Sequence, residues 1–290
     1  MLFSSSGIGK LCGLTSLIAF GLVGEIFAAD PPHIVFVTGD DEYRSEISMP
    51  MIAGILETHH GMKCSIVYAT DTDSGKPNPK FKTNIPGLEV LEQADLAVFF
   101  MRFRALPDDQ FEQIMKYARS GKPMIGFRTS THAFLYDQKH PLAKWNDDFG
   151  KQVFGQRWIT HHGHESSTDV SILEDAKDHP ILHGVEPKFH CMSWLYHVAP
   201  LVGECTPLLE GVSINSNKVD QQDQFPLTQP VAWTKEFEGA KVFFTTLGHP
   251  KDFENESMRR LTVNSIFWGL GCEVPEKANV DVEYVAPPTH

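Results

Sequence analysis

Short apolar runs alternate with amphipathic segments along the first half of the chain. The apolar runs are rich in β-branched and aromatic side chains, as is typical of buried strands. They predict strands at His33–Thr38, Lys63–Ala69, Asp95–Met101 and Pro123–Phe127. The amphipathic segments predict helices at Ser48–His60, Leu88–Gln93 and Pro107–Ser120. Because strand and helix alternate, we expect an α/β fold: a doubly wound, mostly parallel sheet with helices on both faces.

The second half of the chain has a less regular pattern. Apolar and aromatic segments predict strands at Asp169–Leu173, His190–His197, Pro230–Thr234 and Lys241–Thr246. The last two flank Glu238-Gly239, which predicts a hairpin turn. Helices are expected at Pro141–Gly155 and Glu256–Leu270. Residues 273–290 are rich in proline and polar residues, so we expect a tail that lies on the surface or is disordered.

Residues 1–29 have the pattern of a secretory signal peptide. Lys10 precedes the apolar run Leu11–Phe27, which ends at Ala28-Ala29. Glycines and Glu25 interrupt this run, and it is short for a membrane span of about 20 residues. We therefore expect export to the periplasm or the outside rather than a stable membrane span. Residues 30–272 are expected to form one α/β domain, followed by the tail at 273–290.

Composition and cysteine count narrow the partners and the compartment. The chain has 290 residues and a formal net charge of −12. Nucleic-acid binding requires a basic patch, so we expect no nucleic-acid partner. The cysteines beyond residue 29 are Cys64, Cys191, Cys205 and Cys272. An oxidising compartment permits disulfides, with Cys191–Cys205 the favoured pair, and four unpaired thiols are an equal alternative.

Polar clusters follow or flank several of the predicted strands. They are Asp40–Glu46, Arg102–Arg104, Arg128–His132, His161–Glu165 and His249–Asp252. The first three each follow a strand at its carboxyl end, and in a parallel sheet these ends share one edge. Separate loops that converge in this way are what a binding site requires.

Within these clusters, several side chains are candidates for chemistry. His132 and His249 are candidate general acid/base residues, with helix capping as the alternative. Arg128 is a candidate clamp for a carboxylate or sugar hydroxyls, with an ion pair to Asp137 or Asp252 as the alternative. The candidate substrate-binding residues are Asp40, Glu42, Arg102, Ser130 and Trp158. Nucleophilic catalysis is poorly supported, because the turn that contains Ser130 is not GxSxG and holds no cysteine.

The histidine-rich segment suggests a metal site. On an extended strand, His162 and His164 point to the same side, where one divalent cation such as zinc could bind both. His132 or His249 would be the further ligand. The alternative is a solvated loop, since the sequence has no HExxH motif and no Cys–His spacing of a known zinc site.

Several stretches together resemble the ThuA-like (trehalose utilisation) family. They are GKPMIGFRTSTHAF, the Asp178-His179-Pro180 turn before Ile181-Leu182-His183-Gly184, and KVFFTTLGHPKDF followed by RRLTVNSIFWGLG. The resemblance covers roughly residues 33–272 and implies a class I glutamine amidotransferase-like fold, which is flavodoxin-like. It implies a crevice built from the loop after Thr38, from Arg128–His132, from His161–His164 and from His249.

The chain also differs from proteins of this family and fold at two places. Thr129-Ser130 stands where the amidotransferase nucleophile would be, so a cysteine-dependent amidotransferase is not expected. Trp194-Leu195-Tyr196-His197 replaces an acidic Asp-Glu pair that many relatives carry.

The resemblance also implies a function in carbohydrate catabolism, with (3-keto-)glycosides or disaccharides as substrates. A ketone at C3 acidifies the C2 proton, so a histidine base could remove it and expel the C1 leaving group. Arg128 or a metal would stabilise the enolate. The protein would then be a glycoside-cleaving hydrolase or lyase. The alternative is a non-catalytic carbohydrate-binding module on the same fold, and a homo-oligomer is compatible with either.

Overall fold

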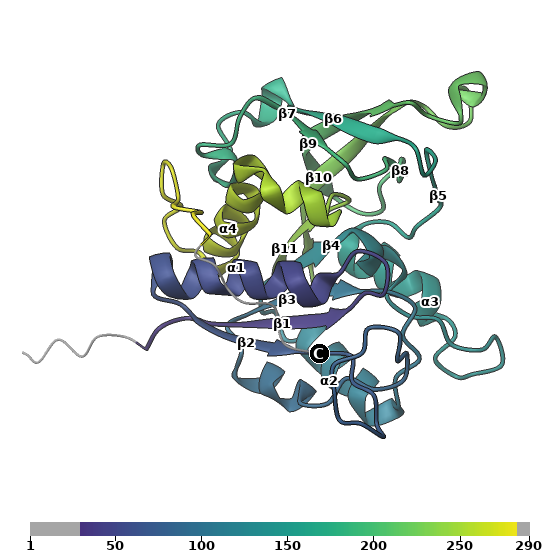
Figure 1. Cartoon of the computed structure of the whole chain (residues 1–290), viewed down its shortest axis with the longest axis vertical. Coiled ribbons are helices and arrows are strands. Elements are labelled where there is room, and N and C mark those ends of the chain that lie inside the picture. Colours follow the sequence, from purple (N-terminus) through teal and green to yellow (C-terminus); the bar gives the residue numbers. More distant parts are fainter. Residues whose placement is uncertain (1–29, 283–290) are drawn as a thin grey trace, which may run out of the picture. The chain divides into compact units, whose positions relative to one another are not determined.

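The computed structural model describes residues 30–282, and its centre is one large mixed sheet (Figure 1). The predicted signal peptide at 1–29 and residues 283–290 lie outside the described residues. Within 30–282 the sheet has nine strands in the order β2-β1-β3-β4-β11-β10-β9-β6-β7. The parallel strands are β1 (His33–Gly39), β2 (Lys63–Val67), β3 (Leu96–Met101), β4 (Met124–Phe127) and β11 (Ala240–Thr245). The antiparallel strands are β10 (Thr228–Phe237), β9 (Cys205–Ile214), β6 (Ser167–Ile172) and β7 (Lys188–Cys191).

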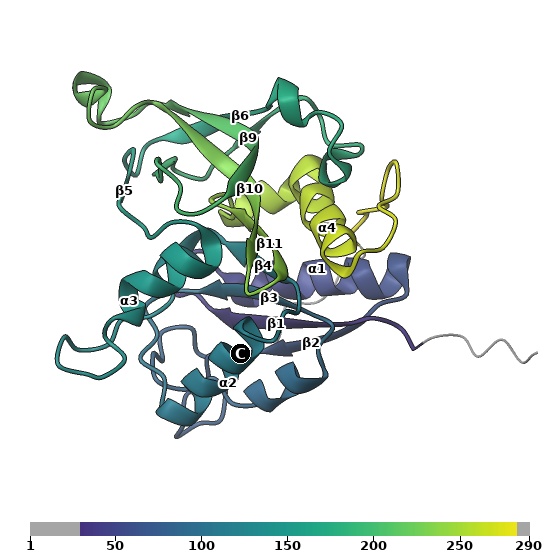
Figure 2. The same ribbon diagram turned by 180° about the vertical axis from the view of Figure 1, so that it is seen from behind.

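Helices cover both faces of the parallel half. The helix α1 (Ser45–His60) and the helix α4 (Glu256–Leu270) pack on one face, and α2 (Asp108–Ala118) packs on the other (Figures 1 and 2). Two apolar clusters result, one on each side of the sheet. This arrangement confirms the predicted α/β class, and the order β2-β1-β3-β4 is the doubly wound order in which ligands bind at the carboxyl ends of β1 and β3.

The predicted elements of the parallel half are confirmed with small shifts at their ends. The helix α1 begins at Ser45, three residues before the predicted start, and Arg44 before it has φ 55°. The predicted helix at 88–93 is a 3₁₀ helix. The predicted hairpin is formed by β10 and β11, and α4 has the predicted bounds.

Three segments of the second half differ from the prediction. The Pro141–Gly155 helix is replaced by α3 (Trp145–Asp148) and a wide π-helical turn at Phe149–Phe154. Gly150 lies so close to the Arg128–His132 turn that an added Cβ would be 2.1 Å from the carbonyl oxygen of Thr131. The predicted strand His190–His197 is divided between β7 and β8 (Tyr196–His197), and β8 pairs with β5 (Thr160–His161) in a separate ribbon.

The strand β9 was not predicted. Its sequence CTPLLEGVSI contains Pro207 and Gly211, which usually argue against a strand inside a sheet. At Gly211 the strand passes so close to its neighbours that an added Cβ would be 2.5 Å from Val231 and 2.6 Å from Thr168. These neighbours leave no room for a Cβ, so only a glycine fits at this position.

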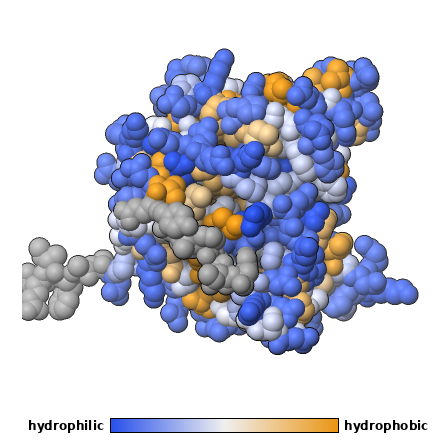
Figure 3. All heavy atoms as spheres, in the orientation of Figure 1, coloured by the Kyte–Doolittle hydropathy of each residue, from blue (hydrophilic) through white to orange (hydrophobic). Residues whose placement is uncertain are grey.

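The described part of the tail, residues 273–282, packs on α4 rather than extending away. Arg259 Nε donates to the carbonyl oxygen of Val280 at 2.9 Å, and Arg260 Nε donates to that of Ala278 at 3.2 Å. The face seen in Figure 3 is largely hydrophilic, with small scattered apolar patches. Within residues 30–282, no helix is both long enough and apolar enough to cross a membrane.

The four cysteines within residues 30–282 are unpaired, so the favoured Cys191–Cys205 disulfide is not formed and the alternative of four thiols is observed. The register of the sheet explains this. Thr168 of β6 pairs with Cys191 on one side and with Ser213 on the other, which puts Cys191 level with Ser213 of β9. Cys205 lies eight residues before Ser213 on the same strand, roughly 25 Å away, far beyond the Cα spacing of a disulfide.

Candidate functional site

The loops that follow β1, β3 and β4 meet at one edge of the sheet, as the polar clusters predicted. Arg102 Nη1 lies 3.1 Å from Asp41 Oδ1, and Arg102 Nε lies 2.9 Å from Glu42 Oε2. The backbone N–H of Phe103 donates to the carbonyl oxygen of His132 at 3.0 Å. These contacts bring side chains from three separate parts of the chain together.

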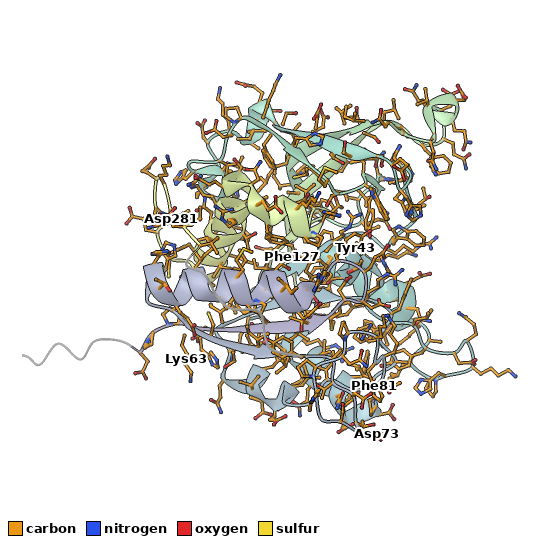
Figure 4. The ribbon with its side chains drawn as sticks, in the orientation of Figure 1. Tyr43, Lys63, Asp73, Phe81, Phe127 and Asp281 are labelled. Atoms are coloured by element: carbon orange, nitrogen blue, oxygen red, sulfur yellow. The ribbon has the colours of Figure 1, made fainter. Side chains whose placement is uncertain are left out.

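A small pocket opens where these loops meet. Its volume is about 160 Å³, and the segment around β5 and β8 closes its other side. The lining residues are Glu42, Tyr43, Arg102, Phe103, His132, Trp158, His161, His164 and Tyr196. Tyr43, labelled in Figure 4, lies just before the first turn of α1. The pocket therefore combines an imidazole-rich polar lining with aromatic walls.

His132 has the environment of a neutral imidazole. Its ring lies against Phe103, with the ring centroids 4.8 Å apart, and against Trp158 at 5.4 Å. Burial lowers the pKa of His132 well below its usual range, and the positive charges of Arg102 and Arg128 lower it further. At neutral pH the ring is therefore uncharged and can accept a proton.

The hydrogen bonds of Thr131 decide which nitrogen of His132 carries the proton. Thr131 Oγ1 donates its single proton to the carbonyl oxygen of Arg128 at 3.1 Å. The same hydroxyl lies 3.0 Å from His132 Nδ1, and while its proton is given to Arg128 it can only accept a hydrogen bond, from Nδ1–H. In this tautomer the lone pair is on Nε2, which takes part in none of the hydrogen bonds described for residues 30–282. Nε2 in this state can accept a proton or a hydrogen bond.

Arg102 supplies the positive charge of the pocket wall. It is held by Glu42 and Asp41, and Asp41 is also paired with Lys82. Burial alone would lower the pKa of Arg102, but the two carboxylates raise it above its ordinary value. Arg102 therefore stays charged and fixed, as a group that stabilises a developing anion must be.

Arg128 has a different place from the one the sequence suggested. Its side chain is fully buried, and the guanidinium lies 4.2 Å from the ring of Tyr43 and 4.4 Å from that of Tyr196. Nη1 donates to the carbonyl oxygens of Thr246 at 2.7 Å and Trp194 at 3.2 Å, and Nη2 donates to Tyr43 Oη at 3.0 Å. Tyr43 and Tyr196 line the pocket and Arg128 does not, so Arg128 supports these two walls from within the protein.

Among the described ion pairs, Arg128 has no carboxylate partner, so the suggested pair with Asp137 or Asp252 is not formed.

Asp40 and Ser130 also stabilise the loops that form the site, without lining the pocket. Asp40 is fully buried, accepts from the backbone N–H groups of Glu42 and Tyr43, and is hydrogen-bonded by Thr129 Oγ1. Ser130 Oγ donates to the carbonyl oxygen of Phe99 at 2.9 Å and accepts from the N–H of Met101 at 3.2 Å. Neither side chain lines the pocket, because both are used to join the loops to the strands.

His249 lies outside the pocket lining, and its ring centroid is 6.3 Å from that of the wall residue Tyr43. Its Nδ1 accepts from the N–H of Lys251 at 3.2 Å, and it caps the 3₁₀ helix Pro250–Glu254. Of the two roles weighed for this residue, the capping role is the one the structure shows.

His162 and His164 do not form the expected metal-binding pair. Gly163, with φ 101°, turns the chain between them, so the segment is not extended there. His162 is fully buried, with Nδ1 2.9 Å from Ser216 Oγ, whereas His164 is exposed and its ring lies 4.8 Å from that of His161. Over residues 30–282, no three His, Cys, Asp or Glu side chains are arranged to hold a metal ion. The donor set therefore does not fit the proposed zinc site.

The comparison with protein families decides what the chain is related to. A family model described as ThuA, trehalose utilisation, matches residues 34–269. The chain belongs to the ThuA family. The match covers nearly all of the range in which the sequence resembles that family. No functionally curated protein matches the ThuA chain.

Solved structures confirm the fold of this ThuA-family chain. A ThuA-like protein from Parabacteroides merdae is 15% identical, with 84% of this chain and 92% of that chain covered and a TM-score of 0.57. A ThuA-like protein from Bacteroides uniformis is 16% identical, with 83% and 93% covered and a TM-score of 0.54. At these identities, the likeness extends to the fold alone.

Four lining residues were not among the candidate site residues. They are Tyr43, Phe103, His161 and Tyr196. The first three lie inside the predicted polar clusters, and the family resemblance had implied the His161–His164 segment as part of the crevice. Tyr196 could be expected to stack on a sugar ring, but an aromatic residue in a strand is more often part of the core.

Proposed function

We propose that this ThuA-family protein binds a carbohydrate in the pocket at His132 and cleaves a 3-keto-glycoside there. The observation that carries the proposal is the position of the Thr131 hydroxyl, 3.1 Å from the Arg128 carbonyl oxygen and 3.0 Å from Nδ1 of the pocket residue His132, which favours the tautomer with its lone pair on Nε2. The aromatic walls, Tyr43, Phe103, Trp158 and Tyr196, suit the apolar faces of a sugar ring. Glu42 and Arg102 offer acceptors and donors to its hydroxyls.

The chemistry follows from the acidity that a C3 ketone gives to C2. His132 Nε2 takes the C2 proton, and the electron pair moves toward the C3 oxygen, where Arg102 stabilises the enolate. Collapse of the enolate forms a C1=C2 double bond and breaks the bond from C1 to the glycosidic oxygen. The imidazolium of His132 then returns its proton to the departing oxygen. This assignment places Arg102 where the sequence had suggested Arg128, because Arg128 is buried behind the pocket.

A second candidate function is carbohydrate binding without turnover. One observation favours it: burial and the neighbouring arginines hold the pKa of His132 well below its usual range, which weakens the ring as a base. This candidate needs the aromatic walls and the polar side chains but no proton transfer.

Incubation of the purified protein with 3-keto-trehalose and other 3-keto-glycosides, with and without a chelator, tests the proposal. Release of the leaving-group sugar that is insensitive to the chelator is the expected result. Sugar binding by calorimetry without any turnover would replace the proposal with the second candidate. Turnover that is lost with the chelator and restored by zinc would instead make the chemistry metal-dependent.

Export is part of the same proposal, and it rests on residues 1–29. N-terminal sequencing of the protein recovered from the producing cells tests it. A mature chain that begins after Ala28 or Ala29 is expected, and an intact first residue would contradict it.

A further inference from the structure

Trp194 forms an aromatic surface directly beside the pocket. Its ring centroid lies 5.2 Å from that of His161 and 4.3 Å from that of His164, and both histidines line the pocket. Trp194 itself is partly exposed and does not line the pocket. It is therefore the next aromatic side chain beyond the pocket's rim.

The size of the pocket leaves part of a glycoside outside it. Its volume of about 160 Å³ is well below the 300–1,000 Å³ that is usual for sites enclosing a whole drug-sized ligand. One sugar ring is the largest unit that such a pocket encloses. A disaccharide bound with one ring inside must rest its second ring on the surface at the rim.

The backbone that carries Trp194 is fixed before any ligand arrives. Asp252 is buried, and its Oδ1 accepts from the N–H of Ser193 at 3.2 Å while Oδ2 accepts from the hydroxyl of Ser193 at 2.5 Å. On the other side of Trp194, Arg128 Nη1 donates to the Trp194 carbonyl oxygen at 3.2 Å. A surface held in this way loses little conformational entropy when it binds a ligand.

The same carboxylate holds a second ring near Trp194. The backbone N–H of His249 donates to Asp252 Oδ2 at 3.0 Å. The rings of Trp194 and His249 lie 6.0 Å and 6.3 Å from the ring of Tyr43, a wall of the pocket. Trp194 and His249 thus lie beside the same wall residue, and His164 lies beside Trp194. All three are at least partly exposed.

We propose that Trp194, with His164 and His249, forms a second sugar subsite that binds the leaving-group ring of the glycoside. The proposal rests on the proposed function, because it assumes that the first ring occupies the pocket at His132. The indole offers a flat apolar face to the C–H face of a pyranose ring. The two imidazoles offer a donor or an acceptor to its hydroxyls. The substrate class is therefore a disaccharide, or a glycoside whose leaving group is a ring.

The test compares 3-keto-trehalose with methyl 3-keto-α-glucoside, which share the first ring and differ in the second. The readout is the ratio of kcat/KM for the two compounds, or of the dissociation constants by calorimetry if neither compound is turned over. We expect the wild-type protein to prefer the disaccharide and Trp194→Ala to lower that preference by about tenfold. The methyl glucoside should be affected by less than about twofold.

Two control variants separate the subsites. Trp158→Ala removes a wall of the pocket and should weaken both compounds equally. Trp268→Ala removes a tryptophan of α4 that lies 5.1 Å from Lys241 and outside the pocket lining, and should change neither.

Equal losses for both compounds in Trp194→Ala, or no loss for either, would overturn the second subsite and leave the proposed function standing. A preference for the disaccharide that depends on Trp194 in a protein without turnover would keep the subsite and overturn the proposed reaction. A wild-type protein that binds neither compound would overturn both.

Discussion

His132 acquires its properties from the residues around it in the turn and in the pocket wall. Thr131 fixes the tautomer through its bond to the Arg128 carbonyl, and burial together with the positive charge of Arg102 and Arg128 keeps the ring neutral. The turn that carries these residues begins at Arg128, whose φ of 40° is unusual for a side chain with a Cβ. Such backbone geometry persists only where surrounding contacts enforce it, and here the hydrogen bonds of Arg128 do so.

Substitution of His132 tests its place in the reaction. His132→Gln keeps a polar side chain but removes the base, and kcat/KM for 3-keto-trehalose should fall by about 10²–10⁴-fold. His140→Gln changes an exposed histidine outside the pocket and should leave the rate within about twofold. Activity of His132→Gln near the wild-type level would remove His132 from the mechanism.

The pH dependence of the wild-type rate tests the protonation state of the same ring. Because the pKa of His132 is held well below 6.5, the base stays neutral as pH falls through 6.5. We expect kcat/KM to stay level from pH 8 to 6.5 and to fall only in more acidic buffer. A rate that halves near pH 6.5, as for an ordinary histidine, would contradict the described environment.

At the scale of elements, Asp252 joins segments that are far apart in the sequence. It lies in the 3₁₀ helix Pro250–Glu254, and it accepts from the N–H groups of Met192 and Ser193 after β7 and from those of Gly248 and His249 after β11. This explains why the segment at 190–197 does not continue as one strand. The donors of Met192 and Ser193 are used by Asp252 and are not available to a neighbouring strand.

Replacement of the Asp252 carboxylate by an amide of the same shape should weaken the hydrogen bonds that join the segments after β7 and β11. Asp252→Asn replaces an acceptor oxygen by an N–H₂ donor, so at least one of the buried N–H groups loses its partner. We expect unfolding in urea to require about 3 kcal/mol less free energy than in the wild type. Asp169→Asn, in an exposed position on β6, is the matched control and should change stability by less than about 0.5 kcal/mol. Equal stabilities of the two variants would contradict this account of Asp252.

At the scale of the whole described molecule, the pocket is lined by residues from both the first and the second half of the chain. One side comes from the loops that follow the parallel strands, and the other comes from β5, β8 and the segments beside them. Several histidines are buried in or near this junction in the neutral form. Burial is the main cause that lowers the pKa of His161 and of His162 to about 4. His132 has a lowered pKa as well, for the same main reason.

These lowered pKa values predict that acid destabilises the fold. In the unfolded chain each ring takes up a proton near pH 6.5, whereas in the folded chain it does so only at lower pH. Their contribution to stability is therefore complete above pH 6.5 and is lost as pH falls from 6.5 toward about 4. Fully buried His162 should contribute about 1.4 kcal/mol per pH unit in that window.

Urea unfolding at several pH values measures this slope. His162→Gln removes one titrating ring and should make the dependence between pH 6.5 and 4 shallower than in the wild type. His190→Gln, on an exposed ring of β7, is the control for the loss of any histidine. An unchanged slope in His162→Gln would show that His162 is not buried in the neutral form.

The sequence by itself determined the parallel half of the fold. Apolar runs such as Ile34–Val37 and Leu96–Met101 are buried on both faces, and their pattern is a local property of the chain. It also determined that the loops after β1, β3 and β4 share an edge, because parallel topology requires it. From this rule Glu42, Arg102 and His132 were expected at one edge of the sheet, and all three line the same pocket there.

Only the tertiary structure decided which side chains face the pocket. Asp40, Arg128 and Ser130 belong to the same clusters, yet they point into the protein, where buried donors and acceptors require partners. The strand β9 depends on neighbours distant in the sequence, so no local pattern could signal it. Such neighbours also decide whether Tyr196 is a core residue or a wall of the pocket. The tautomer of His132 depends on the Thr131 hydroxyl and the Arg128 carbonyl oxygen, which are close in the sequence but which only the three-dimensional geometry of the turn brings into contact.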